Sequence, residues 1–566
     1  RDRLRSRGLG DVYKRQFSNN KNAPLCKMQR SVFVAMVAFL TPYDIIKLYL
    51  FFPKIVKSYI PLKRGNFVHN LLSKTVKEKY SVLKVFFLVL LFFGANVFLS
   101  FSTDSYSTLS AGFHTAAQDM LERNGRPIIA LIYKLHSLSG LPGISFYYIS
   151  SGLALLFLGI AVWLYQKLLA RYSLPENIRI LLAFASIANI YIIEYFMFIE
   201  KCGFMLAILF NVIAVQSICG FFERKNTHPC NVSLLCAVLA MTLAVFTYQG
   251  TVALFVVLSI PFAFYHAKNF REYVCNIISI GVCYAVPVLL AFAAFKWVFN
   301  GTRLQTDFNL LANLKEFFGG LWMCNMETFD IFPHYIFLLA VLLILAAAVI
   351  SARGTDKPAF LEKLHILVLF AAACVFPAAT ILQGSGWWTP RTVYPLASIA
   401  GVLAINSFIN HPIQPDSTAS VCIAKRVSIA VIAVLLVVQY FGFTRLYIDK
   451  YKLNALDESR CCYVGQAISE YEETSGIEIR KIAFYTDAES AIPTYPHLYS
   501  HTGDLICSSF NQSWSDLSAL NYYLGTNYEK VDPVEKYDIY FSEKNWDHLS
   551  QGQLIFDGDT LHLCIY

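Results

Sequence analysis

Long apolar runs limit what the first 446 residues of this chain can form. Runs of about 16 to 22 apolar residues let a helix cross the roughly 30 Å of membrane hydrocarbon. Five such runs are at residues 82–101, 144–164, 203–222, 274–295 and 427–443. Shorter or interrupted runs are at residues 180–193, 232–248, 250–265, 335–350, 366–382 and 393–409. We therefore expect an all-α polytopic membrane protein with about eleven transmembrane helices.

The composition excludes an ordinary soluble protein. Hydrophobic residues make up 56% of the chain, charged residues make up 15%, and the mean hydropathy is +0.49. Soluble domains carry about 25% charged residues, so this chain has too few to cover a soluble surface. These proportions indicate an integral membrane protein that contacts membrane lipids, and we expect no nucleic-acid partner.

The formal net charge of +9 combines two unlike parts of the chain. Residues 447–566 hold 8 Lys or Arg against 19 Asp or Glu, a net charge of −11, which leaves +20 for residues 1–446. We expect residues 82–446 to form the transmembrane domain. Residues 447–566 are expected to form a small extracytoplasmic α/β domain. Within it, the residue pattern predicts a helix at 467–471 and strands at 481–485, 537–541 and 561–566.

The N-terminal residues are interpreted separately. Residues 6–16 read SRGLGDVYKRQ and look like an in-frame translation of a sequencing-library adaptor, so we interpret residues 1–16 as an artefact. Residues 17–81 are expected to be a cytoplasmic, basic segment. Within it, residues 32–52 are interrupted by Pro42, Asp44 and Lys47, which favours an interfacial helix over a membrane span.

Positive charge is concentrated in alternate loops, which predicts the orientation of the chain. The basic loops carry Lys167, Arg171, Arg224, Lys225, Lys268, Arg271, Arg353, Lys357, Lys363, Lys425 and Arg426. These loops and the N-terminus are expected to be cytoplasmic. The opposite loops and the C-terminal domain are then expected to be outside, so that the candidate functional residues lie on one face.

The strongest candidate site is the polar loop at residues 102–127, just after the first span. It carries Asp104, Asp119, Arg123 and Arg126 in an otherwise apolar chain, and membrane stability alone gives no reason to gather such charges. A carboxylate at Asp104 suits proton abstraction from a sugar hydroxyl, and a guanidinium at Arg126 suits a phosphate. The alternatives are a helix-capping or interfacial carboxylate for Asp104, a lipid-headgroup anchor for Arg126, and a solvated surface residue for Asp119.

Further candidates follow in other loops of the same expected face. Glu194 and Glu200 lie in the second external loop, and Gln249 lies in a turn between two spans. Trp388 and Arg391 lie in the stretch WWTPRTVYP, where an aromatic ring beside an arginine suits a sugar phosphate. An aromatic belt at the membrane surface is the alternative for Trp388.

Four short motifs, in order, carry a family resemblance. They are NGRP at residues 124–127, Tyr-Gln-Gly at 248–250, WWTPRTVYP at 387–395, and the ending NWDHLS…QLIFDGDTLHLCIY at 545–566. Together they resemble the GtrII-type glucosyl transferase family of bacterial envelope proteins, from about residue 82 to residue 566. The resemblance implies a polytopic GT-C-like glycosyltransferase in the bacterial cytoplasmic membrane. Such an enzyme takes a hexose, glucose in this family, from a polyprenyl-phosphate carrier and transfers it to an envelope polysaccharide or glycolipid at the outer face.

By the same resemblance, Asp104 matches the acidic residue of the first external loop. Many GT-C enzymes carry two adjacent acids there, whereas Asp104 is followed by Ser105. This departure favours inverting transfer by a single base with no metal, and no divalent cation or other cofactor is expected. Asp104 would be the catalytic base, with Arg126 and Arg391 or Arg123 at the departing phosphate.

Two other classes of protein compete with this interpretation. A flippase or transporter of lipid-linked sugars would use a charged central cavity, whereas the predicted spans hold few ionisable residues. A polytopic acyltransferase of surface glycans would need a catalytic histidine, and neither His114 nor His136 has an evident partner in the sequence.

Overall fold

The computed structural model describes residues 66–564 with gaps at 99, 173, 224–229, 299–308, 353–356, 376–387, 411–418, 486–504, 545 and 547–548. The expected artefact at 1–16 and the expected interfacial helix at 32–52 lie outside the described residues. The chain divides into two units, residues 1–77 and 78–566. The first described helix is α4 (Asn66–Phe93).

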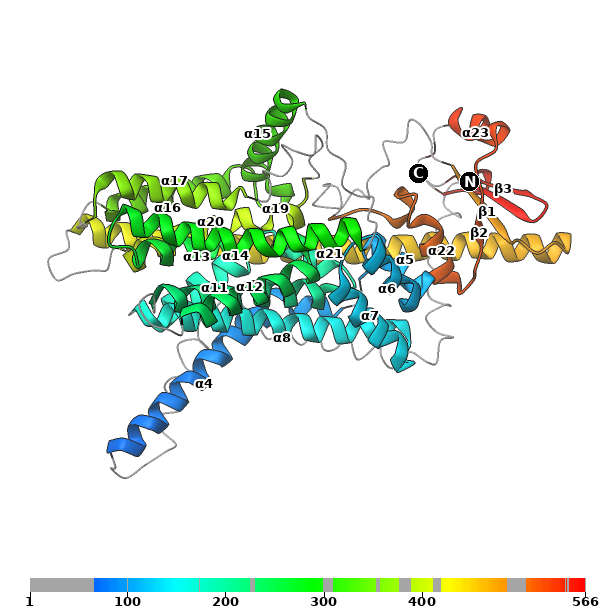
Figure 1. Cartoon of the computed structure of the whole chain (residues 1–566). Coiled ribbons are helices and arrows are strands. Elements are labelled where there is room, and N and C mark those ends of the chain that lie inside the picture. Colours follow the sequence, from blue (N-terminus) through cyan, green and yellow to red (C-terminus); the bar gives the residue numbers. More distant parts are fainter. Residues whose placement is uncertain are drawn as a thin grey trace, which may run out of the picture. The chain divides into compact units, whose positions relative to one another are not determined.

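The described part of the chain is mostly helical (Figure 1). The helices after α4 are α5 (Thr103–Ala111), α6 (Phe113–Glu122), α7 (Pro127–Ser139), α8 (Gly143–Leu169), α9 (Glu176–Ile187), α10 (Ile192–Met197), α11 (Lys201–Glu223), α12 (Cys230–Thr247), α13 (Ala253–Tyr265) and α14 (Phe270–Trp297). The later helices are α15 (Leu310–Met326), α16 (Ile336–Ser351), α17 (Ala359–Ala373), α19 (Pro390–Ala397), α20 (Ile399–Asn410), α21 (Ala419–Ser475), α22 (Asp516–Leu524) and α23 (Glu535–Ser542).

Six helical segments in the described residues are long and apolar enough to cross a membrane. They are Tyr80–Val97, Gly143–Tyr172, Lys201–Glu223, Phe270–Trp297, Pro390–Asn410 and Ala419–Ser475. Three shorter apolar helices are Val232–Thr247, Gln249–Tyr265 and Ile336–Ser351. The fold is therefore that of a helical membrane protein, but the described part of the chain does not contain eleven full spans. Helix α9, for example, has 12 residues, fewer than the roughly 20 needed for a span.

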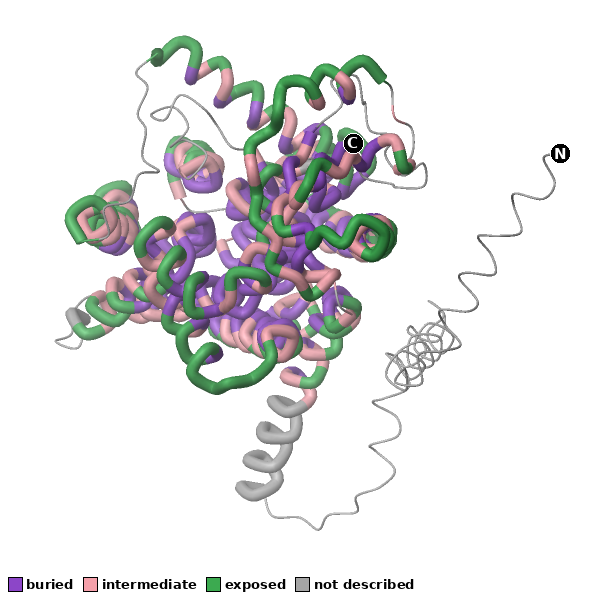
Figure 2. Tube along the Cα trace, turned by 90° about the vertical axis from the view of Figure 1, so that its right-hand side faces the viewer, coloured by how far each residue is buried: buried purple, intermediate pink, exposed green. Residues whose placement is uncertain are grey.

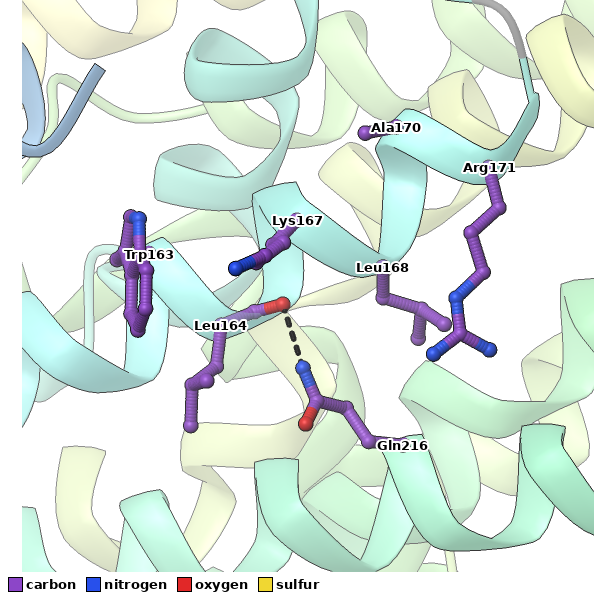
Figure 3. Close-up of a pocket in the computed structure, with 7 residues that line it drawn as sticks. All are labelled: Trp163, Leu164, Lys167, Leu168, Ala170, Arg171 and Gln216. Carbon is purple, nitrogen blue, oxygen red and sulfur yellow. Dashed lines mark hydrogen bonds between the residues drawn. The ribbon is translucent and has the colours of Figure 1, made fainter. Parts of the chain in front are cut away.

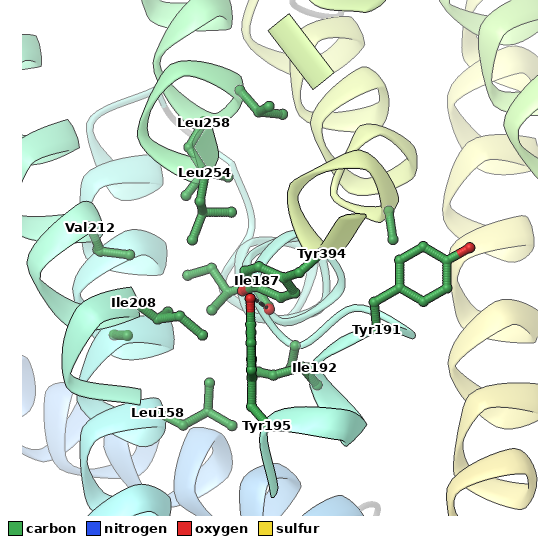
Figure 4. Close-up of a cluster of buried hydrophobic side chains, with 14 of the residues drawn as sticks. Leu158, Ile187, Tyr191, Ile192, Tyr195, Ile208, Val212, Leu254, Leu258 and Tyr394 are labelled. Atoms are coloured by element: carbon green, nitrogen blue, oxygen red, sulfur yellow. Dashed lines mark hydrogen bonds between the residues drawn. The ribbon is translucent and has the colours of Figure 1, made fainter. Parts of the chain in front are cut away.

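The core of the second unit lies where α8, α9, α11, α13 and α20 meet. Figure 2 shows the buried residues gathered between the helices, with the exposed residues around them. The side chains drawn in Figure 4 include Leu158, Ile187, Ile208, Val212, Leu254, Leu258 and Tyr394, all of them buried. Two tyrosines tie α19 to its neighbours α9 and α10. Tyr394 Oη donates to Ile187 O at 2.6 Å, and Tyr195 Oη donates to Arg391 O at 2.7 Å.

Helix α21 connects the bundle to the C-terminal sheet. It contains 57 residues and at 1.5 Å per residue is about 85 Å long, far more than one membrane crossing needs. The expected domain boundary at residue 447 therefore lies inside a continuous helix. Val464 and Ile468, near the end of α21, join the hydrophobic core around Ile482, Leu561 and Leu563, so the sheet packs on the same helix that runs through the bundle.

The C-terminal sheet has four strands in the order β2-β1-β4-β3. Strand β1 (Lys481–Tyr485) is parallel to β2 (Glu529–Lys530) and to β4 (Thr560–Cys564), and β3 (Leu554–Asp557) is antiparallel to β4. The strand expected at 481–485 is confirmed, the one expected at 561–566 is confirmed as far as Cys564, and the helix expected at 467–471 lies inside α21.

The strand expected at 537–541 is wrong, because these residues belong to helix α23. Pro533 lies just before this helix, and Glu535 and Asp538 occupy its first turn. Acidic residues near a helix N-terminus are stabilised by the partial positive charge there. These helix-start signals outweigh the β propensity of the aromatic and branched residues that follow.

Candidate functional site

Helix α5 carries Asp104 and begins directly after the first membrane-spanning segment. Ser102 and Ser105 form a reciprocal capping box at its N-terminus, with their hydroxyls 2.9 Å apart. Asp104 lies in the first helical turn, where a carboxylate is favourable for the helix. Its side chain is exposed, so the cap holds the backbone while the Asp104 carboxylate remains accessible.

Arg126 is positioned by the sharp turn between α6 and α7. Gly125 has a positive φ of 61°, and a Cβ at this position would lie 2.6 Å from the Phe295 ring, so only glycine fits. Gln249 Nε2 donates to Gly125 O at 3.2 Å, and Pro127 starts α7 immediately after Arg126. The NGRP motif thus forms a tight turn between α6 and α7 that positions the backbone of Arg126.

The Arg126 guanidinium lies over an aromatic ring and forms no ion pair within the described residues. Its central carbon is 4.7 Å from the centre of the Tyr248 ring, a favourable cation–π distance. Arg126 Nε is buried and has no hydrogen-bond partner. A buried N–H of a charged group without an acceptor is costly, so this atom marks a place where an anionic ligand would be stabilised.

Glu200 lies within electrostatic range of both Asp104 and Arg126. It precedes α11, its side chain is buried, and its Oε2 accepts a hydrogen bond from Tyr133 Oη at 3.2 Å. Burial raises the pKa of the Glu200 carboxyl, the Asp104 charge raises it further, and the Arg126 charge and the Tyr133 hydroxyl lower it. The charges of Asp104 and Arg126, which lie in two other segments, therefore both influence Glu200.

Arg391 differs from Arg126 because it already has an acidic partner. Arg391 Nε lies 3.4 Å from Glu194 Oε1, and the side chains are 15% and 1% exposed respectively. The Arg391 backbone N–H also donates to Glu194 Oε2 at 2.6 Å. Tyr195 and Tyr248 connect this pair to Arg126. Tyr195 Oη donates to Arg391 O at 2.7 Å, its ring centre is 5.5 Å from that of Tyr248, and Arg126 lies over the Tyr248 ring.

Three other predicted site residues have partners outside this group. Arg123 Nη1 and Asp119 Oδ1 are 3.8 Å apart, and both side chains are largely exposed, so they pair with each other on the surface of α6. Trp388 packs against α15, because a Cβ at Gly320 would lie 2.1 Å from its ring. Its indole N–H is buried and has no hydrogen-bond partner.

The sequence interpretation did not identify Tyr133, Lys201 or Trp514 as site residues. Lys201 is fully buried beside Glu200, and its Nζ donates to Asn96 Oδ1 at 3.2 Å. The available signal for Lys201 in the sequence was the charged pair Glu200-Lys201 at the start of the apolar helix α11. Trp514 Nε1 donates to Asp104 Oδ1 at 3.1 Å, and no local pattern predicts a contact over 410 residues.

A pocket of about 550 Å³ lies between α8 and α11, among the loops expected to be cytoplasmic (Figure 3). Lys167 lies 4.9 Å from the centre of the Trp163 ring, and Gln216 Nε2 donates to Leu164 O at 2.8 Å. None of the predicted site residues lines this pocket. We place the candidate site at the polar residues around Asp104 and Arg126 and not at this pocket.

Two ion pairs link helices near the ends that were expected to be cytoplasmic. Lys84 pairs with Glu176 at 2.9 Å, and Arg171 pairs with Glu223 at 2.9 Å. Within the described residues, no group of three or more His, Cys, Asp or Glu side chains is arranged to hold a metal ion.

The fold defines a helical protein of the membrane-embedded class. No family model, curated protein or solved structure matches this chain. The resemblance to the GtrII-type glucosyl transferases therefore stays a prediction.

Proposed function

We propose that this chain is a membrane glycosyltransferase that moves a hexose, glucose by the family resemblance, from a polyprenyl-phosphate carrier to an envelope polysaccharide or glycolipid. The reaction takes place at the outer face of a bacterial cytoplasmic membrane. The proposal includes a GT-C-like bundle in which the shorter apolar helices also lie within the membrane. Six long apolar helices and a polar group that includes Asp104 and Arg126 support it.

The observation that carries the proposal is the environment of the Arg126 guanidinium. Its Nε is buried without a hydrogen-bond acceptor, and its guanidinium is held over Tyr248. A phosphate oxygen would supply the acceptor and the opposite charge together. Arg391 is already paired with Glu194, so Arg126 is the better candidate for the phosphate of the donor.

The reaction follows from the chemistry of these groups. The Asp104 carboxylate takes the proton of an acceptor hydroxyl as that oxygen attacks the anomeric carbon of the donor. The bond between this carbon and the phosphate oxygen breaks, and polyprenyl phosphate leaves with the bonding electrons. Arg126 stabilises the negative charge on the departing phosphate. Attack opposite the leaving group inverts the anomeric configuration, and no step requires a metal ion.

The remaining acidic residues have supporting roles in the proposal. Glu200, with a pKa raised mainly by burial, orients a sugar hydroxyl together with Tyr133. The Glu194–Arg391 pair holds the first turn of α19 against α10. Gln249 holds the turn that carries Arg126 through its bond to Gly125 O.

The test uses the full-length chain purified in detergent. A radiolabelled polyprenyl-phosphate hexose is incubated with envelope polysaccharide, and labelled polysaccharide is measured. The proposal expects transfer that depends on Asp104 and continues when EDTA is added. Movement of the intact lipid-linked sugar across vesicles without transfer would instead identify a flippase, and an acyl group on the glycan would identify an acyltransferase.

A further inference from the structure

The C-terminal part of the chain contacts the helix that carries Asp104. Tyr106 Oη and Tyr523 Oη are 2.6 Å apart, which joins α5 to α22 (Figure 1). Ser107 Oγ donates to Trp514 O at 3.0 Å, and Trp514 Nε1 donates to Asp104 Oδ1 at 3.1 Å. Contacts from successive turns of α5 thus place the Trp514 indole ring directly beside Asp104, the proposed base.

The turn that carries Trp514 is held firmly from several sides. Ser515 Oγ donates to Ser509 O at 2.5 Å, and Lys530 Nζ donates to Ser513 O at 2.7 Å. Asp457 of α21, which is fully buried, accepts hydrogen bonds from Ser508 Oγ at 2.6 Å and from the Ser509 backbone N–H at 2.9 Å. Trp514 is therefore presented by an ordered turn.

In spite of these anchors, 50% of Trp514 is exposed. A large apolar ring is normally buried where the fold allows, and here the backbone around it is fixed while the ring remains accessible. Ligand sites commonly combine an aromatic face with a few polar groups that set orientation. A sugar has apolar C–H faces and hydroxyl edges, so an indole ring beside a carboxylate matches both kinds of surface.

We propose that Trp514 forms the acceptor-sugar subsite. Its ring packs against the acceptor sugar, and its N–H holds the Asp104 carboxylate toward the attacking hydroxyl. Trp514 is thus a binding residue through its ring and a positioning residue through its N–H. This inference rests on the proposed glycosyl transfer and gives the C-terminal domain a specific part in the reaction, since Trp514 lies in that domain.

Two substitutions separate the two roles of Trp514. Trp514→Phe keeps an aromatic ring but removes the N–H donor, so kcat should fall about tenfold, as expected for a lost hydrogen bond to a charged group. The KM for the acceptor should stay within about twofold of wild type, because the ring face is retained. Trp514→Ala should show the same fall in kcat and, in addition, an acceptor KM raised about five- to tenfold.

The control is Trp322→Ala, which removes another exposed tryptophan, on α15, and should leave both constants at wild-type values. The purified full-length variants are compared at equal folded concentration, with thermal unfolding measured in parallel. The Ser107 contact uses the Trp514 backbone carbonyl, which both substitutions retain. Trp514→Phe also keeps a large aromatic ring, so it should fold like wild type even if Trp514→Ala does not.

Hydrolysis of the donor without any acceptor sugar provides a second readout. In hydrolysis, water replaces the acceptor sugar, so no aromatic ring is needed to bind that sugar. Trp514→Ala and Trp514→Phe should therefore hydrolyse the donor at equal rates, although their KM values for the acceptor in transfer differ. If wild type is active and both variants match it, the subsite inference is wrong and the proposed function stands. If wild type neither transfers nor hydrolyses the donor, the proposed function fails and the inference fails with it.

Discussion

Arg126 and Tyr248 form a cation–π pair, with the guanidinium carbon 4.7 Å from the ring centre. Tyr248 follows α12, and Arg126 precedes α7, so the contact joins two turns far apart in the chain. The ring supports one face of the guanidinium without neutralising its charge. This leaves Arg126 able to bind an anion, whereas a carboxylate in the place of Tyr248 would have competed with one.

Replacing Asp104 by Asn should lower turnover by about 10²- to 10⁴-fold, the usual contribution of a general base. The fold should persist, because Asp104 is exposed and an Asn side-chain oxygen can still accept the hydrogen bond from Trp514. Transfer assays with equal amounts of folded protein test this. Asp119→Asn, at the exposed surface pair on α6, is the matched control. Wild-type turnover of Asp104→Asn would leave Asp104 as an interfacial helix cap.

Arg126→Lys should reduce transfer about 10- to 100-fold, the range for a lost hydrogen bond to a charged group. A lysine keeps the charge but has no planar fork to stack on Tyr248 and grip a phosphate. Arg123→Lys provides the contrast, because Arg123 lies on the surface in a pair with Asp119 and its exchange should change activity little. The donor concentration dependence of transfer is measured for both variants. Equal activity of the two variants would show that Arg126 is only a headgroup anchor.

Glu194→Gln should destabilise the protein strongly, on the order of 3 kcal/mol, because it leaves the mostly buried Arg391 without its anionic partner. Glu223→Gln breaks a more exposed pair with Arg171 and should cost about 1 kcal/mol or less. Thermal unfolding in detergent compares the two variants with wild type. A larger loss of stability in Glu223→Gln than in Glu194→Gln would contradict the structural role given to the Glu194–Arg391 pair.

The stability of the wild type should depend on pH through Glu200. Its pKa in the folded protein is raised above the ordinary value of 4.5, mainly by burial, so the folded state holds this proton more tightly than the unfolded state. Stability should therefore fall as pH rises from 4.5 towards the folded pKa. Glu200→Gln removes this dependence, so its melting temperature should exceed that of wild type by a margin that grows with pH. A margin independent of pH would contradict the burial of an ionisable Glu200.

The proposed topology predicts opposite labelling for two cysteine positions in intact cells. Cys462 is exposed on α21 in the part expected outside, and Lys268 is exposed in a loop expected to be cytoplasmic. In a cysteine-free background, Cys462 alone should react with a membrane-impermeant maleimide. Lys268→Cys alone should react only after permeabilisation. The reverse pattern would place the C-terminal domain in the cytoplasm.

The sequence by itself determined the membrane class and much of the secondary structure, because helix length and apolar composition are local properties. The six long apolar helices coincide with expected runs such as residues 144–164 and 274–295. Local chemistry also predicted the strand at 481–485 correctly. At 537–541 the same reasoning failed, since the helix signals precede the aromatic residues that suggested a strand.

Only the tertiary structure decided which charged residues act together. The sequence put Arg126 first for the phosphate and left Arg391 or Arg123 open as its helper. In the structure Arg123 pairs with Asp119 on the surface, and Arg391 pairs with buried Glu194. Arg126 alone of the three has a buried N–H with no acceptor among the described residues. The contact between Trp514 and Asp104 likewise has no local signal. The pairing of charges depends on how segments hundreds of residues apart pack, and a linear pattern does not encode those distances.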